Sequence, residues 1–477
     1  MEEQTVRKLR APGIRLLFVV LVGLALTVPL LFVYALVSDR QQQAATAQAE
    51  IVGGWGGSQV LSGPIIAVPF RTTGSETVME NGKQVTRISE VEKLFYIAPV
   101  SHDLSTRIDP EERRKSIYRS VLYTAKVHGS AVFALPPDLD RFGVTRERLM
   151  WDRAELRIGV SDARGLITGA SLAAAGKPLV LQPGKGPAAS GGQGFFAFLG
   201  WDGNGALEVK YDYGLRGSRS ISVVPRGGAT RWAVTSAWAS PSFGGGFLPE
   251  RRSVGASGFS ASYQVDKLAL GQPPVGMEDY QATNTGDPNR FGFAEAITSS
   301  SSVAAGGAAE VVASGGSTMT VQLIEPVNLY SKVDRAVKYG FLFIGFTFLT
   351  FFLFDVVAGA RVASAEYLLA GAGLVLFFVL LLAFAEVIGF TLAYLLASAA
   401  IIGLLSSYSA AILHSRGRGL LIGLLLTGLY ALLYVLLSLE AWSLLIGAVL
   451  LFVALAGVMY ATRNVDWQAS RRLDPER

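Results

Sequence analysis

The sequence predicts an α-helical membrane protein with six transmembrane helices and a large β-rich, antiparallel domain outside the cytoplasm. Three observations support this fold class. The chain of 477 residues is 51% hydrophobic and only 17% charged. Its uncharged apolar runs lie near the N-terminus and after residue 335, and each can cross a hydrocarbon core of roughly 30 Å as a helix. Between them, roughly 300 residues follow mainly a period of two, which is typical of half-buried strands.

The first transmembrane helix is predicted at residues 16–37, after a basic cytoplasmic N-terminus at residues 1–15. Its run of about 22 uncharged residues is longer than the apolar part of a cleaved signal peptide, so we expect it to be retained as an anchor. Residues 38–50 contain neither Gly nor Pro. The helix is therefore expected to continue out of the membrane as a stalk until the glycines around Trp55.

Residues 38–335 are predicted to form the β-rich domain, as a sandwich or a long twisted sheet. Strands are expected at residues 64–70, 91–98, 118–127, 154–160, 207–215, 220–225, 231–238 and 259–265. Two tracts, at 183–194 and 299–317, have too little apolar surface to offset chain entropy and are expected to be flexible. The first tract leaves open whether the domain has one or two subdomains.

Residues 336–461 are predicted to form a five-helix bundle, followed by a cytoplasmic tail at residues 462–477. Basic residues are concentrated in alternate short loops and in the tail, and the other short loops hold Glu386 and Glu440. This distribution predicts cytoplasmic N- and C-termini. The pair Gly419 and Gly423 has the spacing of a helix-packing motif.

Composition and motif searches argue against several function classes. The chain has no Cys, so thiolate chemistry is excluded, and its three His residues are far apart in sequence. No nucleotide-binding loop or hydrolase motif occurs, and the helices have no ionisable group near their centres. We therefore expect no catalytic residue, metal or cofactor, and no ion-coupled transport. The net charge of +5 is explained by the loops, so nucleic acid is not an expected partner.

The chain changes from soluble domain to membrane between residues 323 and 357, and this junction holds the first candidate site. Its charged and aromatic side chains are candidates for coupling the domain to the membrane: Glu325, Tyr330, Lys332, Asp334, Arg335, Lys338 and Tyr339. A second candidate is a contact surface on the β-rich domain formed by Trp238, Phe243 and Phe247, since aromatic residues are enriched at interfaces. The alternative for this stretch is a buried strand end with a Gly hairpin.

The junction LIEPVNLYSKVDRAVKYGFLFIGFTFLTFFLFD closely resembles the signature of the CreD family of bacterial inner-membrane proteins. Further motifs resemble that family in the same order, namely SQVLSGPIIAVPF, ERRKSIYRSVLYTAKVHG, GLRGSRSISVVPRGG, AWASPSFGGGFLPERR, GFSASYQV and YLLAGAGLVLFFVLLLAFAEVIGF. The resemblance implies an inner-membrane protein with a periplasmic domain that supports envelope integrity and stress tolerance. It implies no catalytic residue. Val387 departs from the family, which commonly has His after the Glu that matches Glu386.

The leading hypothesis is a non-enzymatic protein of the bacterial inner membrane that contributes to envelope integrity through its periplasmic domain. Its expected partners are the lipid bilayer, an envelope protein or cell-wall component, and a second copy of the chain. One alternative is a permease-like subunit of a transport machine, which would need a separate ATPase. Another is a periplasmic sensor, although the cytoplasmic parts are too short to hold a signalling domain.

Overall fold

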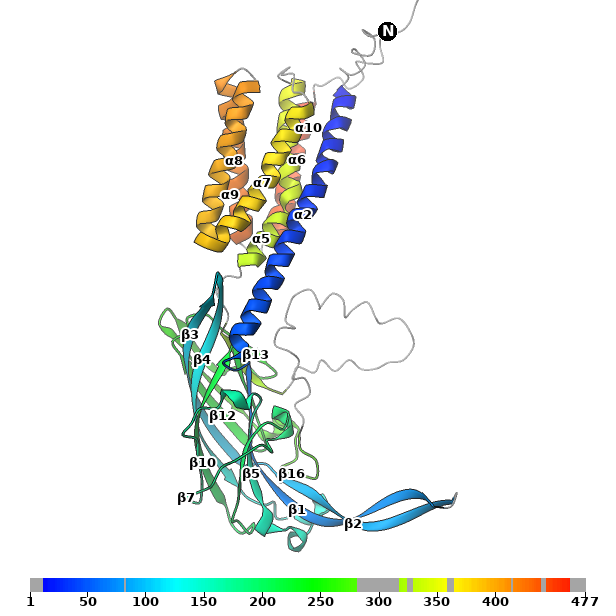
Figure 1. Ribbon diagram of the computed structural model, residues 1–477, viewed down its shortest axis with the longest axis vertical. Coiled ribbons are helices and arrows are strands. Elements are labelled where there is room, and N and C mark those ends of the chain that lie inside the picture. The colour runs from blue at the N-terminus through cyan, green and yellow to red at the C-terminus, as the bar shows by residue number, and fades with distance from the viewer. Residues whose placement is uncertain are drawn as a thin grey trace, which may run out of the picture. The chain divides into compact units, whose positions relative to one another are not determined.

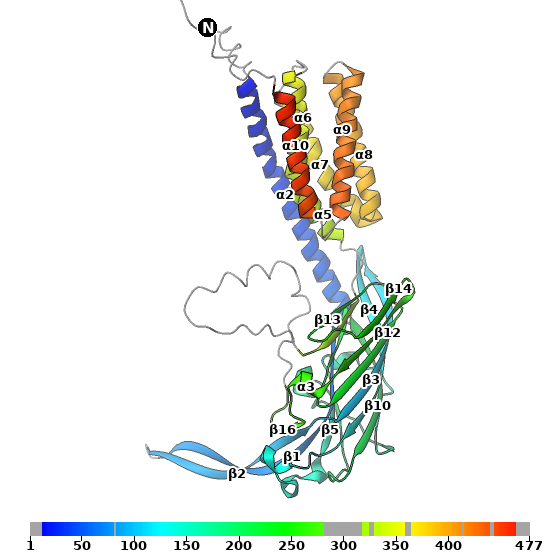
Figure 2. The same ribbon diagram turned by 180° about the vertical axis from the view of Figure 1, so that it is seen from behind.

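A computed structural model describes residues 12–80, 83–280, 317–323, 329–357, 364–412, 415–438 and 443–463 (Figures 1 and 2). The chain divides into two compact units. The helical unit comprises Met1–Thr46 and Val327–Arg477, and the strand unit comprises Ala47–Pro326. The sequence placed these borders at residues 38 and 335. The structure places the second border earlier, and the short helix Leu329–Lys338 therefore belongs to the helical unit.

The helical unit contains helices at every predicted span. They are α2 (Pro12–Gly53), α5 (Leu329–Lys338), α6 (Gly340–Val357), α7 (Ser364–Ile388), α8 (Phe390–Ile412), α9 (Arg416–Ser438) and α10 (Ser443–Thr462). Within the described residues, four of these helices, α2, α7, α8 and α9, are long and apolar enough to cross a membrane by length and composition. These helices fit a multi-pass membrane protein. Helices α6 and α10 coincide with the other two predicted spans.

Helix α2 confirms the predicted stalk. It continues without a break to Gly53, and its last residues belong to the strand unit. The following turn requires glycine, because Gly56 has φ +144° and a Cβ there would lie 2.9 Å from the carbonyl oxygen of Arg216. The glycines that the sequence identified after the stalk therefore end the helix.

Small residues bring α8 and α9 together. A Cβ on Gly419 would lie 2.4 Å from the Cβ of Ala410, and one on Gly423 would lie 2.5 Å from Oγ of Ser406. Both predicted glycines therefore face the neighbouring helix, as expected for a packing motif. Tyr394 adds a polar tie, since its hydroxyl donates to the carbonyl oxygen of Tyr430 over 2.6 Å.

The strand unit contains two sheets within its described residues, one of nine strands and one of eight. The nine-stranded sheet comprises β13 (Pro241–Gly245), β17 (Met319–Leu323), β11 (Ser220–Val224), β1 (Gln59–Glu80), β5 (Glu155–Val160), β9 (Gly194–Phe198) and β8 (Gln182–Pro183) in that order, with β2 (Lys83–Ile97) on β1 and β16 (Val275–Gly276) on β2. The eight-stranded sheet has the order β14 (Arg251–Gly255), β15 (Gly258–Val265), β12 (Ala229–Ser236), β3 (Ser101–Lys115), β4 (Tyr118–Phe133), β10 (Leu207–Ser218), β6 (Ser171–Ala174) and β7 (Lys177–Pro178). All predicted strands are present.

The two sheets share one hydrophobic core, so the unit is a β-sandwich. Trp232 of β12 stacks on Tyr263 of β15 with ring centroids 5.0 Å apart. Tyrosine hydroxyls reach from the eight-stranded sheet to the other sheet, where Tyr123 donates to the carbonyl oxygen of Ser220 over 2.8 Å. Each buried ring thus combines apolar contact with a satisfied polar group.

The prediction of a purely antiparallel domain is wrong at two positions. Strand β1 pairs with β11 in parallel, and β3 pairs with β12 in parallel. The sequence could not show this, because the alternation of buried and exposed residues is the same in both directions of pairing. The two strands of each parallel pair are far apart in sequence, and so no hairpin connection fixes their direction.

The tract at residues 183–194, which the sequence predicts to be flexible, makes defined contacts in the structure. Residues Ala188–Ser190 form a 3₁₀ turn, and Ser190 Oγ donates to the carbonyl oxygens of Pro187 and Gln193 over 2.9 and 2.7 Å. Nζ of Lys185 contacts Glu155 of β5 at 2.6 Å. Polar contacts hold this tract where apolar surface is scarce. Residues 299–316 of the second predicted flexible tract lie outside the described residues.

Candidate functional site

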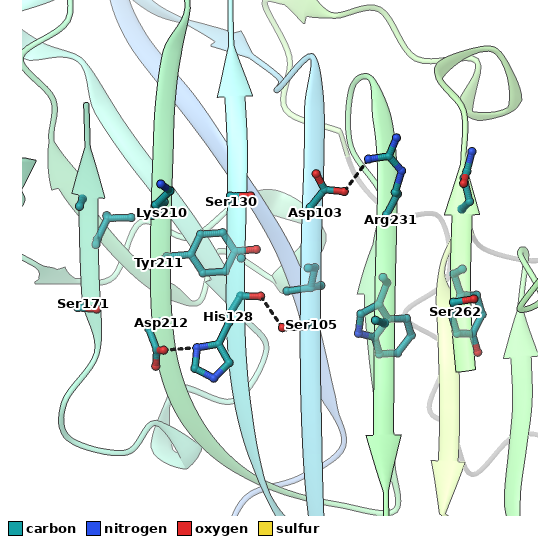
Figure 3. Close-up of a pocket in the computed structure, with 18 of the residues that line it drawn as sticks. Asp103, Ser105, His128, Ser130, Ser171, Lys210, Tyr211, Asp212, Arg231 and Ser262 are labelled. Carbon is teal, nitrogen blue, oxygen red and sulfur yellow. Dashed lines mark hydrogen bonds and ion pairs between the residues drawn. The ribbon is translucent and has the colours of Figure 1, made fainter. Parts of the chain in front are cut away.

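An open groove of about 900 Å³ lies on the face of the eight-stranded sheet that points away from the core (Figure 3). Residues of β3, β4, β6, β10, β12 and β15 line it. Along each of these strands, alternate side chains enter the core, and the intervening ones face the groove. The groove therefore uses the side of the sheet that the hydrophobic pattern leaves free.

Strand register arranges the outward side chains in two rows across the sheet. One row contains Arg231, Asp103, Ser130 and Lys210, which are direct neighbours on β12, β3, β4 and β10. The second row lies two residues away from the first on every strand and contains Ala233, Ser105, His128 and Asp212. Ser130 and Ser105, the small residues on the two central strands β4 and β3, leave room between the larger polar side chains.

Two contacts join ionisable side chains of the groove to each other. Arg231 donates to Asp103 over 3.1 Å, and Nδ1 of His128 contacts the carboxylate of Asp212. Apart from His128, the lining has equal numbers of carboxylates and cations: Asp103, Asp212, Glu250, Lys210, Arg231 and Arg251. The charged side chains of the groove therefore balance, with no strong field of either sign.

Ser105, His128 and Asp212 have the composition of a hydrolytic triad but not its geometry. In such a triad the serine hydroxyl hydrogen-bonds to the imidazole ring. Here Oγ of Ser105 instead donates to the backbone carbonyl oxygen of His128, at a long 3.5 Å, while the ring points to Asp212 (Figure 3). The arrangement therefore lacks the hydrogen bond between serine and imidazole that such a triad requires.

A buried hydrogen bond supports the floor from the core side. The ring of Tyr211 lies across Gly129, where a Cβ would meet it at 2.2 Å. The hydroxyl of Tyr211 pairs with Nε2 of His102 at 2.6 Å. Complete burial lowers the pKa of His102 to about 4, so this ring is neutral at pH 7. The pair fixes β3 to β10 beneath the groove.

In the helical unit, one of the predicted coupling residues, Tyr330, contacts the carboxylate of Glu386. The hydroxyl of Tyr330, at the start of α5, donates to Oε1 of Glu386 over 3.2 Å. Arg40 of α2 reaches the same oxygen with its Nε at 4.0 Å. The Glu386 side chain is only 12% exposed. This cluster connects α2, α5 and α7, and the sequence had not included Arg40 or Glu386 among the coupling residues.

The other predicted coupling residues make separate contacts along α5. Lys338 pairs with Asp334 at 2.7 Å and lies above the ring of Tyr34, with Nζ 5.9 Å from its centroid. Lys332 lies above the ring of Phe390 at 5.4 Å. Arg335 donates to the carbonyl oxygen of Ser331 within α5 over 3.4 Å, and Tyr339 is half-buried at the end of α5. Glu325 lies outside the described residues.

The predicted aromatic surface of the strand unit is half-buried. Trp238, Phe243 and Phe247 all pack against the core of the sandwich. The ring of Phe243 meets that of Phe259 edge-on, with centroids 5.8 Å apart. These contacts favour the second interpretation of this stretch, a strand end followed by a Gly hairpin.

Sequence reasoning missed the groove. Strand β3, which supplies its centre, was not predicted because its alternation continues into the charged run Asp109–Lys115, which includes a Pro. The alternation of residues 207–215 did place Lys210 and Asp212 on the exposed side. The cross-strand neighbours of these two residues could be found only from the pairing register. In the described part of the chain, no three His, Asp or Glu side chains gather to hold a metal ion.

Comparison with known proteins identifies the family. The family model described as inner membrane protein CreD matches residues 11–468. The inner membrane protein CreD of Escherichia coli strain K12 is 31% identical over 452 residues, which cover 94% of this chain and 91% of that protein. No solved structure matches the chain. The chain therefore belongs to the CreD family of inner membrane proteins.

Proposed function

We propose that this protein is a non-enzymatic component of the bacterial inner membrane that contributes to envelope integrity by binding an envelope component in the groove of its strand unit. The observation that carries the proposal is the groove itself, an open surface of about 900 Å³ that is balanced in formal charge and has two contacts between its own ionisable side chains. Such a surface can bind a ligand without further reorganisation of its charges. The misaligned Ser105 hydroxyl argues against hydrolysis there.

We place the strand unit in the periplasm and both termini in the cytoplasm. All six predicted spans then cross the membrane, including α6 and α10, which have 18 and 20 residues. The basic residues Arg416, Arg418 and Arg463, at the ends of α9 and α10, support this orientation, because short cytoplasmic loops are enriched in Lys and Arg.

The second element of the proposal is coupling between the strand unit and the membrane helices. Helix α2 runs through both units as one continuous helix. Within the strand unit its end is held by Glu50, which pairs with Lys115, and by Trp55, which lies between Arg113 and Arg216 at 3.9 and 4.5 Å from its ring centroid. Cation–π contacts of this kind resist separation of the stalk from the sheet.

The placement is testable with single cysteines, because the natural chain has none. Ser260→Cys lies on the exposed face of β15, and Gly417→Cys lies at the start of α9. In intact spheroplasts, a membrane-impermeant maleimide should label the first variant, and it should label the second only after permeabilisation. Labelling of Gly417→Cys in intact spheroplasts, or protection of Ser260→Cys, would refute the orientation.

The envelope role is testable in cells that lack the native gene product. A chain in which a Gly/Ser linker replaces residues 58–323 should fail to restore resistance to detergent. Leakage of periplasmic enzymes should also persist in these cells. The full chain at equal membrane abundance should restore resistance to detergent and stop the leakage. Equal restoration by the two chains would show that the strand unit is not needed, and the proposal would fail.

A further inference from the structure

Resting on the proposed binding role of the groove, we propose that its ligand is an uncharged glycan chain, bound across the strands of the eight-stranded sheet. The inference comes from three properties of the groove: its length, its charge and the chemistry of its outward side chains. Each property excludes a different class of ligand.

The groove extends across most of the eight-stranded sheet. Its lining extends from Ser262 on β15 to Ser171 on β6, across six adjacent strands. At a strand spacing of about 4.8 Å, this path measures about 24 Å. A chain of several sugar rings fits such a path, whereas a single small metabolite would occupy only part of it. Because the groove is on the face of the sheet, an extended peptide cannot pair with its backbone as it could at an edge.

The charge of the lining excludes polyanions. Apart from His128, three carboxylates are balanced by three cations, and two central contacts, Arg231 with Asp103 and His128 with Asp212, are already formed. A phosphate- or sulfate-rich polymer would require an excess of Lys and Arg. A neutral ligand leaves both contacts intact and can use their remaining donors and acceptors.

The outward side chains of the lining include no Leu, Ile, Val, Met, Phe, Tyr or Trp that could hold an apolar ligand. The large aromatic rings of the lining, Tyr211, Trp232 and Tyr263, are at most 5% exposed and belong to the core. Facing the groove are hydroxyls of Ser105, Ser130, Ser171 and Ser262 and planar groups such as the amide of Gln264. Hydroxyl and amide groups both donate and accept hydrogen bonds. Sugar hydroxyls and N-acetyl groups match this mixture of donors and acceptors.

The test uses the full-length protein in lipid nanodiscs and saturation-transfer NMR. The glycan probes are chitotetraose and cellotetraose, and a neutral Gly/Ser octapeptide is the competing ligand. With no exposed ring for stacking, we expect weak glycan binding, with a dissociation constant on the order of 1 mM. The signal should come from one or both glycans and not from the peptide.

A matched pair of variants locates the binding. Ala233→Tyr fills the floor of the groove, whereas Thr235→Tyr places the same ring two residues further along the same face of β12, outside the lining. We expect Ala233→Tyr to weaken glycan binding at least tenfold and Thr235→Tyr to leave it unchanged. Ser105→Tyr is a second groove-filling variant, and unchanged thermal unfolding shows that each variant is folded.

Three results would overturn the ligand assignment: no glycan binding at about 10 mM, ten times the expected dissociation constant; binding of the peptide in place of the glycans; or equal glycan binding by the two Tyr variants. Each of these results is separable from failure of the proposed function. If replacement of residues 58–323 still impairs the envelope, the envelope role holds and only the glycan is wrong.

Discussion

His102 is predicted to make the stability of the strand unit depend on pH. The side chain is 1% exposed, and its Nε2 pairs with the hydroxyl of Tyr211 at 2.6 Å. Burial is the main reason that its pKa is lowered from 6.5 to about 4, and the charge of Asp103 opposes this shift. Below pH 6.5 the unfolded chain binds a proton at this residue, but the folded chain does not until about pH 4. The free energy of unfolding therefore falls as the pH drops through this window.

The size of the effect follows from the difference in pKa. One pKa unit corresponds to about 1.4 kcal/mol, so a change from 6.5 to about 4 corresponds to about 3.5 kcal/mol in full, and to about 3 kcal/mol by pH 4, where the folded group is half protonated. The His102→Gln variant keeps a hydrogen-bonding group near Tyr211 but does not titrate. We expect the wild-type protein to lose about 3 kcal/mol more than this variant between pH 7 and pH 4.

Urea unfolding of the full chain in detergent micelles measures this difference. Tryptophan fluorescence reports mainly on the strand unit, because five of the seven tryptophans lie between Ala47 and Pro326. The matched control is His128→Gln, which removes a histidine with a side chain that is 56% exposed. An equally large change in this control would show that the effect is not specific to His102. Parallel pH curves for wild type and His102→Gln would refute the reasoning.

Three further predictions concern packing and ion pairs. Gly129→Ala should lower the free energy of unfolding by about 1–3 kcal/mol, measured by urea unfolding, because the new Cβ would clash with the tyrosine ring above it at 2.2 Å. Arg226→Leu should lower the free energy of unfolding by about 3–5 kcal/mol, because the carboxylate of Asp279, 2.9 Å away and only 9% exposed, would lose its cationic partner. The double variant with Asp279→Asn should recover part of this loss. Absence of any recovery would contradict the explanation. A double-mutant cycle with Arg40→Gln and Glu386→Gln, read from thermal unfolding of the helical unit, should give a coupling free energy of about 0.2–1 kcal/mol between the two side chains. A coupling free energy of zero would show that the contact between Arg40 and Glu386 does not stabilise the protein.

The junction at residues 323–357 shows how far the sequence leads. Its composition correctly indicates where the apolar helix begins, and the charges before it suggest a coupling region. The structure separates the two parts as α5 and α6. It then selects Tyr330 from the candidate group by placing its hydroxyl beside Glu386, 56 residues away. A contact over that distance depends on helix packing, which local composition does not encode.

In the strand unit, too, the sequence predicted local features but not the pairing of distant strands. The alternation along β10 and β15 correctly predicted strands and their buried faces, because burial of every second residue is a local property. The parallel direction of β3 against β12 and the groove were not predictable, because both depend on which strands pair and in which register. For the same reason, the triad-like composition of Ser105, His128 and Asp212 appears only in the folded sheet.

By itself the sequence determined the apolar spans, the stalk, the strand periodicity and the family, since each of these depends on residues close together in the chain or on motifs in a fixed order. Only the tertiary structure decided the sandwich pairing, the groove and the cluster around Glu386. These features combine residues that are distant in the chain. Their proximity results from the burial of a common core and from backbone hydrogen bonding between strands, which act on the whole chain at once.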